Sequence, residues 1–147
     1  MTIDSVYAEL IALIKRAHTL GTVGELLGWD EQVNLPPGGA DQRAAQHAAL
    51  AEAQHAAASA PRLGELLALL EGRDGPTGRP SDLARPAVAP CLSDDQKAVV
   101  ANARRDYDRA TKLPAEFVRE KATQGSRGYH AWARAKAAGE EALRAGR

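Results

Sequence analysis

The fold is decided at one stretch, Leu26-Leu27-Gly28-Trp29-Asp30-Glu31-Gln32-Val33-Asn34-Leu35-Pro36-Pro37-Gly38-Gly39-Ala40-Asp41-Gln42-Arg43. Paired prolines cannot continue a helix, and the glycines after them free the backbone for a new direction. The stretch therefore predicts a corner between two helices. We expect the large side chain of Trp29 to be buried at this corner. Asp30 is expected either to pair with Arg43 or to cap the helix that begins near Gly39.

The segment before the corner has the apolar spacing of an amphipathic helix, which we expect to run from Ile3 to Leu27. Small residues follow one side of it, at Ala17, Gly21, Gly24 and Gly28. They allow another helix to approach closely, at about 1 kcal/mol of helix propensity for each glycine. A phosphate-binding loop is not indicated, because no strand precedes these glycines and no Gly-Lys-Ser/Thr follows them.

Two further helices are predicted directly after the corner. Residues 39–58 are nearly continuous alanine with a thin apolar face, which is strong helix composition. Pro61 suits the first turn of a short helix that ends at Gly72. Its apolar face is made by four leucines, Leu63, Leu66, Leu67 and Leu70.

The second half of the chain begins after a stretch rich in proline and glycine, residues 72–90, which we interpret as a flexible linker. Ser93 and Gln96 have the spacing of a capping box, so a helix should follow to about Thr111. Pro114 can open the next helix, which is expected to reach about Thr123.

The last segment is predicted to be broken at Gly125-Ser126 and then to form a final helix. Phe117 and Val118 are expected to point inward before the break. After it, the predicted inner face is formed by Tyr129, Trp132, Ala133 and Leu143.

Together these elements predict an all-α bundle of about five or six helices in a single region, 1–147. It divides into N-terminal helices (1–71), the linker (72–90) and C-terminal helices (91–147). A chain of 147 residues is long enough for one core. Alanine makes up about a fifth of it, which favours closely packed helices.

Charge and cysteine content narrow the possible partners. Lys and Arg number 19 and Asp and Glu number 19, so overall charge gives no reason to expect nucleic acid or a membrane as a partner. Residues 1–71 hold four basic and nine acidic side chains, whereas residues 72–147 hold fifteen and ten. We interpret this as two solvated faces or an attraction between the halves.

A single cysteine, Cys91, and a start without a basic signal region indicate a cytoplasmic protein.

Metal-binding motifs are not found among the histidines. A helical hydrolytic site needs two histidines four residues apart with a glutamate after the first. The histidines lie at positions 18, 47, 55 and 130, and no two are four apart. Glu52 and His55 could supply two ligands, but zinc needs three or four, so we interpret them as a surface pair.

Other catalytic arrangements are equally incomplete. Ser126, Tyr129 and His130 are close in sequence, but no acid in that segment is placed to orient the histidine. Paired carboxylates, such as those of Asp94 and Asp95, diverge on a helix. Three arginines, Arg104, Arg105 and Arg109, alternate with acids and are typical of a solvated face. We therefore assign no catalytic residue and no metal ligand to this chain.

The order of several short motifs nevertheless resembles the N-terminal part of the carboxypeptidase Taq family of zinc metallocarboxypeptidases. The first set is the Trp29-Asp30 pair with Pro36 and Arg43 behind it. The second begins at Leu92-Ser93-Asp94-Asp95 and continues through Tyr107-Asp108-Arg109, Leu113-Pro114 and Trp132-Ala133-Arg134. The resemblance covers residues 5 to 137. For Trp29, Asp30, Pro36, Arg43, Tyr107, Pro114 and Trp132 it implies a structural role.

The resemblance implies an all-helical fold, usually dimeric, in which N-terminal helices wall a groove and later helices hold zinc or a related divalent ion. Family members release amino acids from the C-termini of peptides. The His-Glu-x-x-His motif, the third metal ligand and the groups that bind the substrate carboxylate belong to a much later part of a longer chain. After Ala138 the expected Asn-Asp-Phe is replaced by Gly139-Glu140-Glu141.

Two functional hypotheses remain open, ahead of a third in which the chain is an independent enzyme with an unrecognised site. In the first, the chain is the N-terminal helical part of a metallocarboxypeptidase and is inactive alone, with a peptide substrate, and zinc or another divalent metal, only in the complete enzyme. Its partner is then the missing C-terminal catalytic part. In the second, it is a free-standing helical module that binds another helical protein or a second copy. In a further alternative, Arg43 faces the substrate groove.

Overall fold

The structure is a computed structural model that describes residues 2–36, 38–72 and 92–145, without the side chains of residues 142 and 143. The described residues form helices and no strand, which confirms the all-α prediction. The helices are α1 (Ile3–Val33), α2 (Ala40–Ala58), α3 (Pro61–Leu70), α4 (Asp94–Thr111) and α5 (Ala115–Ala145). Most of the predicted linker, together with Cys91, lies outside the described residues.

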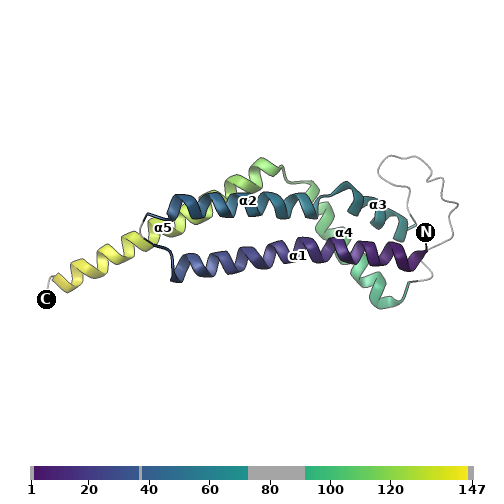
Figure 1. Cartoon of the computed structure of the whole chain (residues 1–147), viewed down its shortest axis with the longest axis horizontal. Helices are drawn as coiled ribbons and strands as arrows, with labels where there is room; N and C mark the ends of the chain where they lie inside the picture. Colours follow the sequence, from purple (N-terminus) through teal and green to yellow (C-terminus); the bar gives the residue numbers. More distant parts are fainter. Residues whose placement is uncertain (1, 37, 73–91, 146–147) are drawn as a thin grey trace.

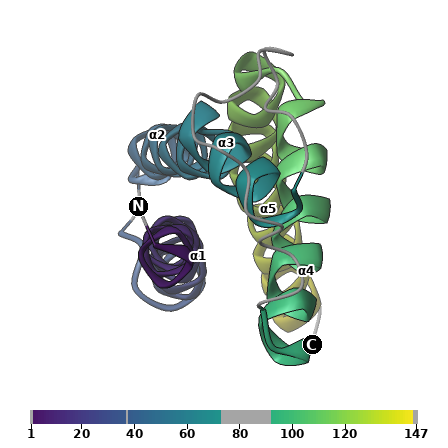
Figure 2. The same cartoon turned by 90° about the vertical axis from the view of Figure 1, so that its right-hand side faces the viewer.

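The long helices lie along the length of the molecule (Figure 1). Helix α2 is at its centre, because both α1 and α5 pack against it. Seen along the length, α1 and α5 lie on different sides of α2 (Figure 2). The last part of α5 extends beyond the ends of α1 and α2 (Figure 1). No helix in the described part of the chain is both long and apolar enough to cross a membrane.

Helix α1 is longer than the sequence pattern indicates. It begins after Thr2, whose side chain accepts the backbone N–H of Ser5, and it continues through Gly28 and Trp29 to Val33. The expected end at Leu27 is therefore wrong. The corner follows Asn34, and Gly38 adopts the left-handed φ of 87° that glycine allows without strain.

The extension of α1 also explains why the prediction for Trp29 is wrong. Trp29 is 58% exposed, although we expected a buried anchor. One helical residue advances the direction of the side chain by about 100°, so Trp29 cannot share the face of Gly28, which lies against α2. The corner residue with a buried side chain is Glu31 instead.

The glycines of α1 face α2 as predicted. A Cβ on Gly24 would lie 3.5 Å from Leu50, and one on Gly21 would lie 2.8 Å from the side-chain amide of Gln54. A larger residue at Gly21 would therefore displace the end of the exposed Gln54 side chain. Small residues on α1 thus allow α2 to pack closely despite its thin apolar face.

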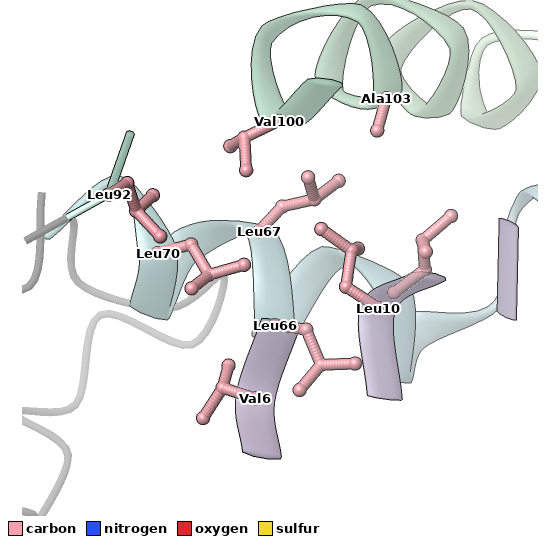
Figure 3. Packing of buried hydrophobic residues seen from close by; sticks show 9 residues of the cluster. Val6, Leu10, Leu66, Leu67, Leu70, Leu92, Val100 and Ala103 are labelled. Atoms are coloured by element: carbon pink, nitrogen blue, oxygen red, sulfur yellow. The ribbon is translucent and has the colours of Figure 1, made fainter. Parts of the chain in front are cut away.

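The main apolar core lies at one end of the molecule, where α3 is enclosed between α1 and α4 (Figure 3). Pro61 occupies the first turn of α3, as predicted. Leu66 and Leu67 are both fully buried. The core is completed by Val6, Leu10, Leu63, Leu70, Leu92, Val100 and Ala103. Four leucines on one short helix thus hold the three helices together.

Helix α4 begins with the predicted capping box. Ser93 Oγ accepts the backbone N–H of Gln96, and the Gln96 side chain accepts the backbone N–H of Ser93. Arg104 forms a bidentate ion pair with Glu71, with N···O distances of 2.9–3.2 Å. Arg104 therefore does not lie on a solvated face as expected, whereas Arg105 and Arg109 are exposed.

Helix α5 is continuous, so the predicted break at Gly125-Ser126 is wrong. A glycine inside a helix costs only about 1 kcal/mol, which extensive packing of α5 on α2 outweighs. The inner face also differs from the prediction. Phe117 and Trp132 are exposed, Val118, Tyr129 and Ala133 are half-buried, and Ser126 is buried. The prediction for Leu143 falls outside the described side chains.

Candidate functional site

The corner between α1 and α2 is closed by an ion pair. Arg43, on the second turn of α2, donates to the carboxylate of Asp30 and also, at 3.5 Å, to the backbone carbonyl of Leu27 near the end of α1. The pairing of Asp30 with Arg43 is one of the two arrangements that the sequence predicts. It connects the two helices on either side of the turn.

The next residue, Glu31, is the centre of a buried polar cluster. Its Oε2 lies 2.9 Å from Nε2 of His47 on α2, and its Oε1 lies 2.6 Å from Nε2 of His130 on α5. The hydroxyl of Ser126, also on α5, donates to Oε1. The side chain is only 7% exposed, so one carboxylate from α1 joins side chains of two other helices in a largely dry environment.

Two opposing effects set the pKa of Glu31. Burial raises the pKa, because it disfavours the charged form. Hydrogen bonds from Ser126, His47 and His130 favour the carboxylate and lower the pKa, and attraction to His47 acts in the same direction. The net result is a pKa below the ordinary value of 4.5, so Glu31 is ionised at neutral pH.

Sequence reasoning missed this cluster because its parts lie far apart in the chain. Ser126 and His130 lacked a nearby acid in their own segment, and the structure supplies that acid from α1, 95 and 99 residues away. The sequence did contain one indication that Glu31 is buried. This charged residue lies three positions after Gly28, on nearly the same face of the helix. That face packs against α2.

A pocket of about 370 Å³ lies beside this cluster, between the start of α2 and the middle of α5. It is lined by Gly38, Ala40, Asp41, Arg127, His130 and Arg134. His130 therefore contacts Glu31 on one side and the pocket on the other. Arg127 lies 3.9 Å from Asp41, and both side chains are largely exposed.

The other residues of the predicted motif lie away from this cluster. Tyr107 packs against the apolar core, with Arg104 over its ring. Pro114 accepts the backbone N–H of Val118 at the start of α5, which agrees with its predicted position. Pro36 accepts the N–H of Gly39 in the corner. Trp132 is exposed next to Tyr129.

His55 also has a structural position. Its Nε2 lies 3.1 Å from the carbonyl oxygen of Ala110 and 2.8 Å from that of Leu113, at the end of α4. Glu52 is exposed, and among the described residues no hydrogen bond or ion pair joins it to this ring. His55 thus helps to satisfy carbonyl groups that a helix end leaves without partners, and the surface pair with Glu52 that we expected is not formed.

Comparison with known proteins identifies the family. A family model described as carboxypeptidase Taq (M32) metallopeptidase matches residues 9–145. The chain belongs to this family. It is 31% identical over 136 residues to thermostable carboxypeptidase 1 of Thermus thermophilus. The matched segment covers 92% of this chain but 24% of that relative, so the chain spans about a quarter of its length. No solved structure matches the chain significantly.

A metallopeptidase family implies a divalent metal ion, but the described residues do not fit one. No three His, Cys, Asp or Glu side chains in these parts of the chain are placed so that they could hold a metal. Glu31, His47 and His130 do not converge on one point, because the two Nε2 atoms approach different oxygens of the carboxylate. No catalytic step is therefore assigned to these residues.

Proposed function

We propose that this chain is the N-terminal helical part of a metal-dependent carboxypeptidase that releases C-terminal amino acids from peptides, and that it is inactive alone. The observation that carries the proposal is the extent of the match: the family model spans nearly the whole chain, whereas the chain spans about a quarter of the Thermus enzyme. On this account zinc or another divalent ion, and the peptide substrate, are bound only by the complete enzyme, in the cytoplasm.

The surface of α1 supports a role as one wall of a larger enzyme. Its second half carries large apolar side chains that face solvent, at Val23, Leu26, Trp29 and Val33. Their spacing of three or four residues places them on one side of the helix. A contiguous apolar stripe is unusual on the surface of an isolated domain and is typical of a surface that contacts more protein. We assign these contacts to the remaining part of a complete carboxypeptidase.

The same stripe favours a second candidate function, a free-standing module for helical interaction or dimerisation. The exposed Trp132 and Phe117 on α5 add to the apolar area. Sedimentation velocity of the purified chain separates the two accounts. The module predicts a discrete oligomer with cooperative unfolding, whereas the wall of a larger enzyme predicts a monomer or an aggregating chain.

For Arg43 we propose a structural role, which its pairing with Asp30 supports. The alternative is that the guanidinium faces a substrate groove. Replacing the equivalent arginine in a full-length relative distinguishes the two. A structural role predicts a lower unfolding temperature with KM unchanged, and a substrate role predicts a higher KM with the unfolding temperature unchanged.

The proposed function is tested by sequencing the coding DNA beyond the codon for Arg147 and translating all three forward frames. A His-Glu-x-x-His motif within the next few hundred codons is the expected result. A stop codon followed by unrelated sequence would contradict the proposal and favour the free-standing module.

A further inference from the structure

The two halves of α1 are held in different ways. The first half enters the apolar core through Val6 and Leu10, which pack against α3 (Figure 3). In the second half the large apolar side chains Leu26, Trp29 and Val33 face solvent and do not anchor the helix. Small residues at Gly21, Gly24 and Gly28 pack this half against α2, and the last turns of the helix add polar contacts, the Asp30–Arg43 pair and the contacts of Glu31.

Glu31 is the point where the end of α1 meets α5. Helix α1 packs mainly on α2 and α3, and α5 packs mainly on α2, so α1 and α5 share little other contact. Ser126 and His130 bring α5 to Oε1 of Glu31, and His47 brings α2 to Oε2. One carboxylate thus connects the last turns of α1 to both neighbouring helices.

We propose that Glu31, His47, Ser126 and His130 form a proton-sensitive latch, which holds the end of α1 against α2 and α5 while Glu31 is ionised and releases it when Glu31 is protonated. The ionised carboxylate can accept hydrogen bonds from both imidazoles and the hydroxyl at once. Protonated Glu31 loses its negative charge and part of its accepting capacity.

Other charged groups around Glu31 do not replace its carboxylate. Asp30 is next to it on α1 but is paired with Arg43 of α2. On α5, Arg127 lies beside Ser126 and near Asp41, and adds positive charge. Protonation of Glu31 therefore removes a negative charge that none of these neighbouring groups replaces. At the other end of α1 the described core residues are apolar, and the carboxylates beside them, Glu71 and Glu9, are paired with Arg104 and Arg62. We expect this end to stay closed.

The latch is tested by pulsed dipolar spectroscopy on spin-labelled chains in which Cys91 is replaced by serine. One label pair, Val33→Cys with Ala131→Cys, reports the distance between the end of α1 and α5. A second pair, Ala8→Cys with Ala98→Cys, reports the core end. All four positions are exposed. As the pH falls from 7 we expect the first distance distribution to broaden while the second stays narrow. The midpoint should lie below 4.5, because burial raises the pKa of Glu31 but the hydrogen bonds to its carboxylate lower it by more.

Variants separate a latch from a merely structural contact. Glu31→Gln should give a broad latch-pair distribution already at pH 7, with a narrow core pair and unchanged helicity. Ser126→Ala removes a hydrogen bond to the carboxylate, so opening should move to higher pH. Glu25→Gln, an exposed acid on the same helix, should behave like the parent chain.

Three results would overturn the proposal. The first is a latch pair that stays narrow down to the pH at which the core pair broadens. The second is broadening of both pairs at the same pH, which would indicate global acid unfolding. The third is a Glu31→Gln chain that either matches the parent at pH 7 or loses its helicity, since the latch requires Glu31 for closure and not for folding.

Discussion

The contact between Gly64 and Tyr107 allows two opposing effects on stability to be compared. Gly64 is buried in α3, and a Cβ added there would lie 2.5 Å from Oη and 2.7 Å from Cζ of Tyr107. Gly64→Ala should gain about 1 kcal/mol from helix propensity. Overpacking a core commonly costs about 1–3 kcal/mol. Because Tyr107 packs against the core and under Arg104, it cannot move freely, and we expect a net loss of about 1 kcal/mol.

Gly125→Ala is the matched control. Gly125 lies inside α5, and nothing stands within 4 Å of an added Cβ, so only the gain in propensity of about 1 kcal/mol remains. The two alanine variants should therefore differ by about 2 kcal/mol in free energy of unfolding, or roughly 4–8 °C in unfolding temperature. Urea denaturation followed by circular dichroism measures the difference.

A double-mutant cycle identifies the source of the loss. In a Tyr107→Leu background the ring is absent, so Gly64→Ala should stabilise the chain as Gly125→Ala does, with a coupling energy of about 1–3 kcal/mol. Overpacking against Tyr107 is refuted as the cause if Gly64→Ala stabilises the parent chain as much as Gly125→Ala. It is also refuted if removing Tyr107 leaves the effect of Gly64→Ala unchanged.

Three further predictions concern the core, the corner and acid stability. Leu66→Ala removes a fully buried side chain and should cost about 2–5 kcal/mol in urea denaturation, whereas Leu26→Ala, at a position 64% exposed, should change stability by less than about 0.5 kcal/mol. Asp30→Asn removes the charged partner of the largely buried Arg43 and should lower the free energy of unfolding by about 1–2 kcal/mol in the same assay. Asp95→Asn, at an exposed position on α4, is the control. Equal losses from the two variants would contradict a stabilising role for the pair. The pKa of Glu31 is lower in the folded chain than its ordinary value of 4.5, so its stabilising effect is complete above that value and is lost as the pH falls through the folded pKa. Glu31→Gln should therefore flatten the decline in unfolding temperature below pH 4.5. An unchanged profile would argue against Glu31 as a source of the acid sensitivity.

Local sequence signals predicted most of the secondary structure. Pro61, the capping box of Ser93 and Gln96, and Pro114 each start a helix as expected, since each acts on backbone groups within a few residues. The glycines of α1 also predicted a close helix neighbour correctly. Two predictions were wrong. Trp29 is exposed because α1 continues past Leu27. Helix α5 is not broken at Gly125-Ser126 because its packing on α2 outweighs the low helix propensity of glycine.

The polar cluster could not be predicted from local patterns. Glu31, His47 and His130 have no characteristic spacing in sequence, and they meet only because α1 and α5 both pack against α2. The Asp30–Arg43 pair was predictable because both residues flank one turn. The sequence therefore indicates contacts across a single corner, whereas contacts that depend on the whole arrangement of helices require the structure.

This chain belongs to a carboxypeptidase family, and we propose that it is inactive alone. The most direct test incubates the purified chain with zinc or cobalt and a series of blocked peptides, and measures released C-terminal amino acids by mass spectrometry, with the Thermus enzyme as positive control. Our account predicts no metal-dependent release and no stoichiometric bound metal. Release that requires the metal and is abolished by a chelator would contradict it.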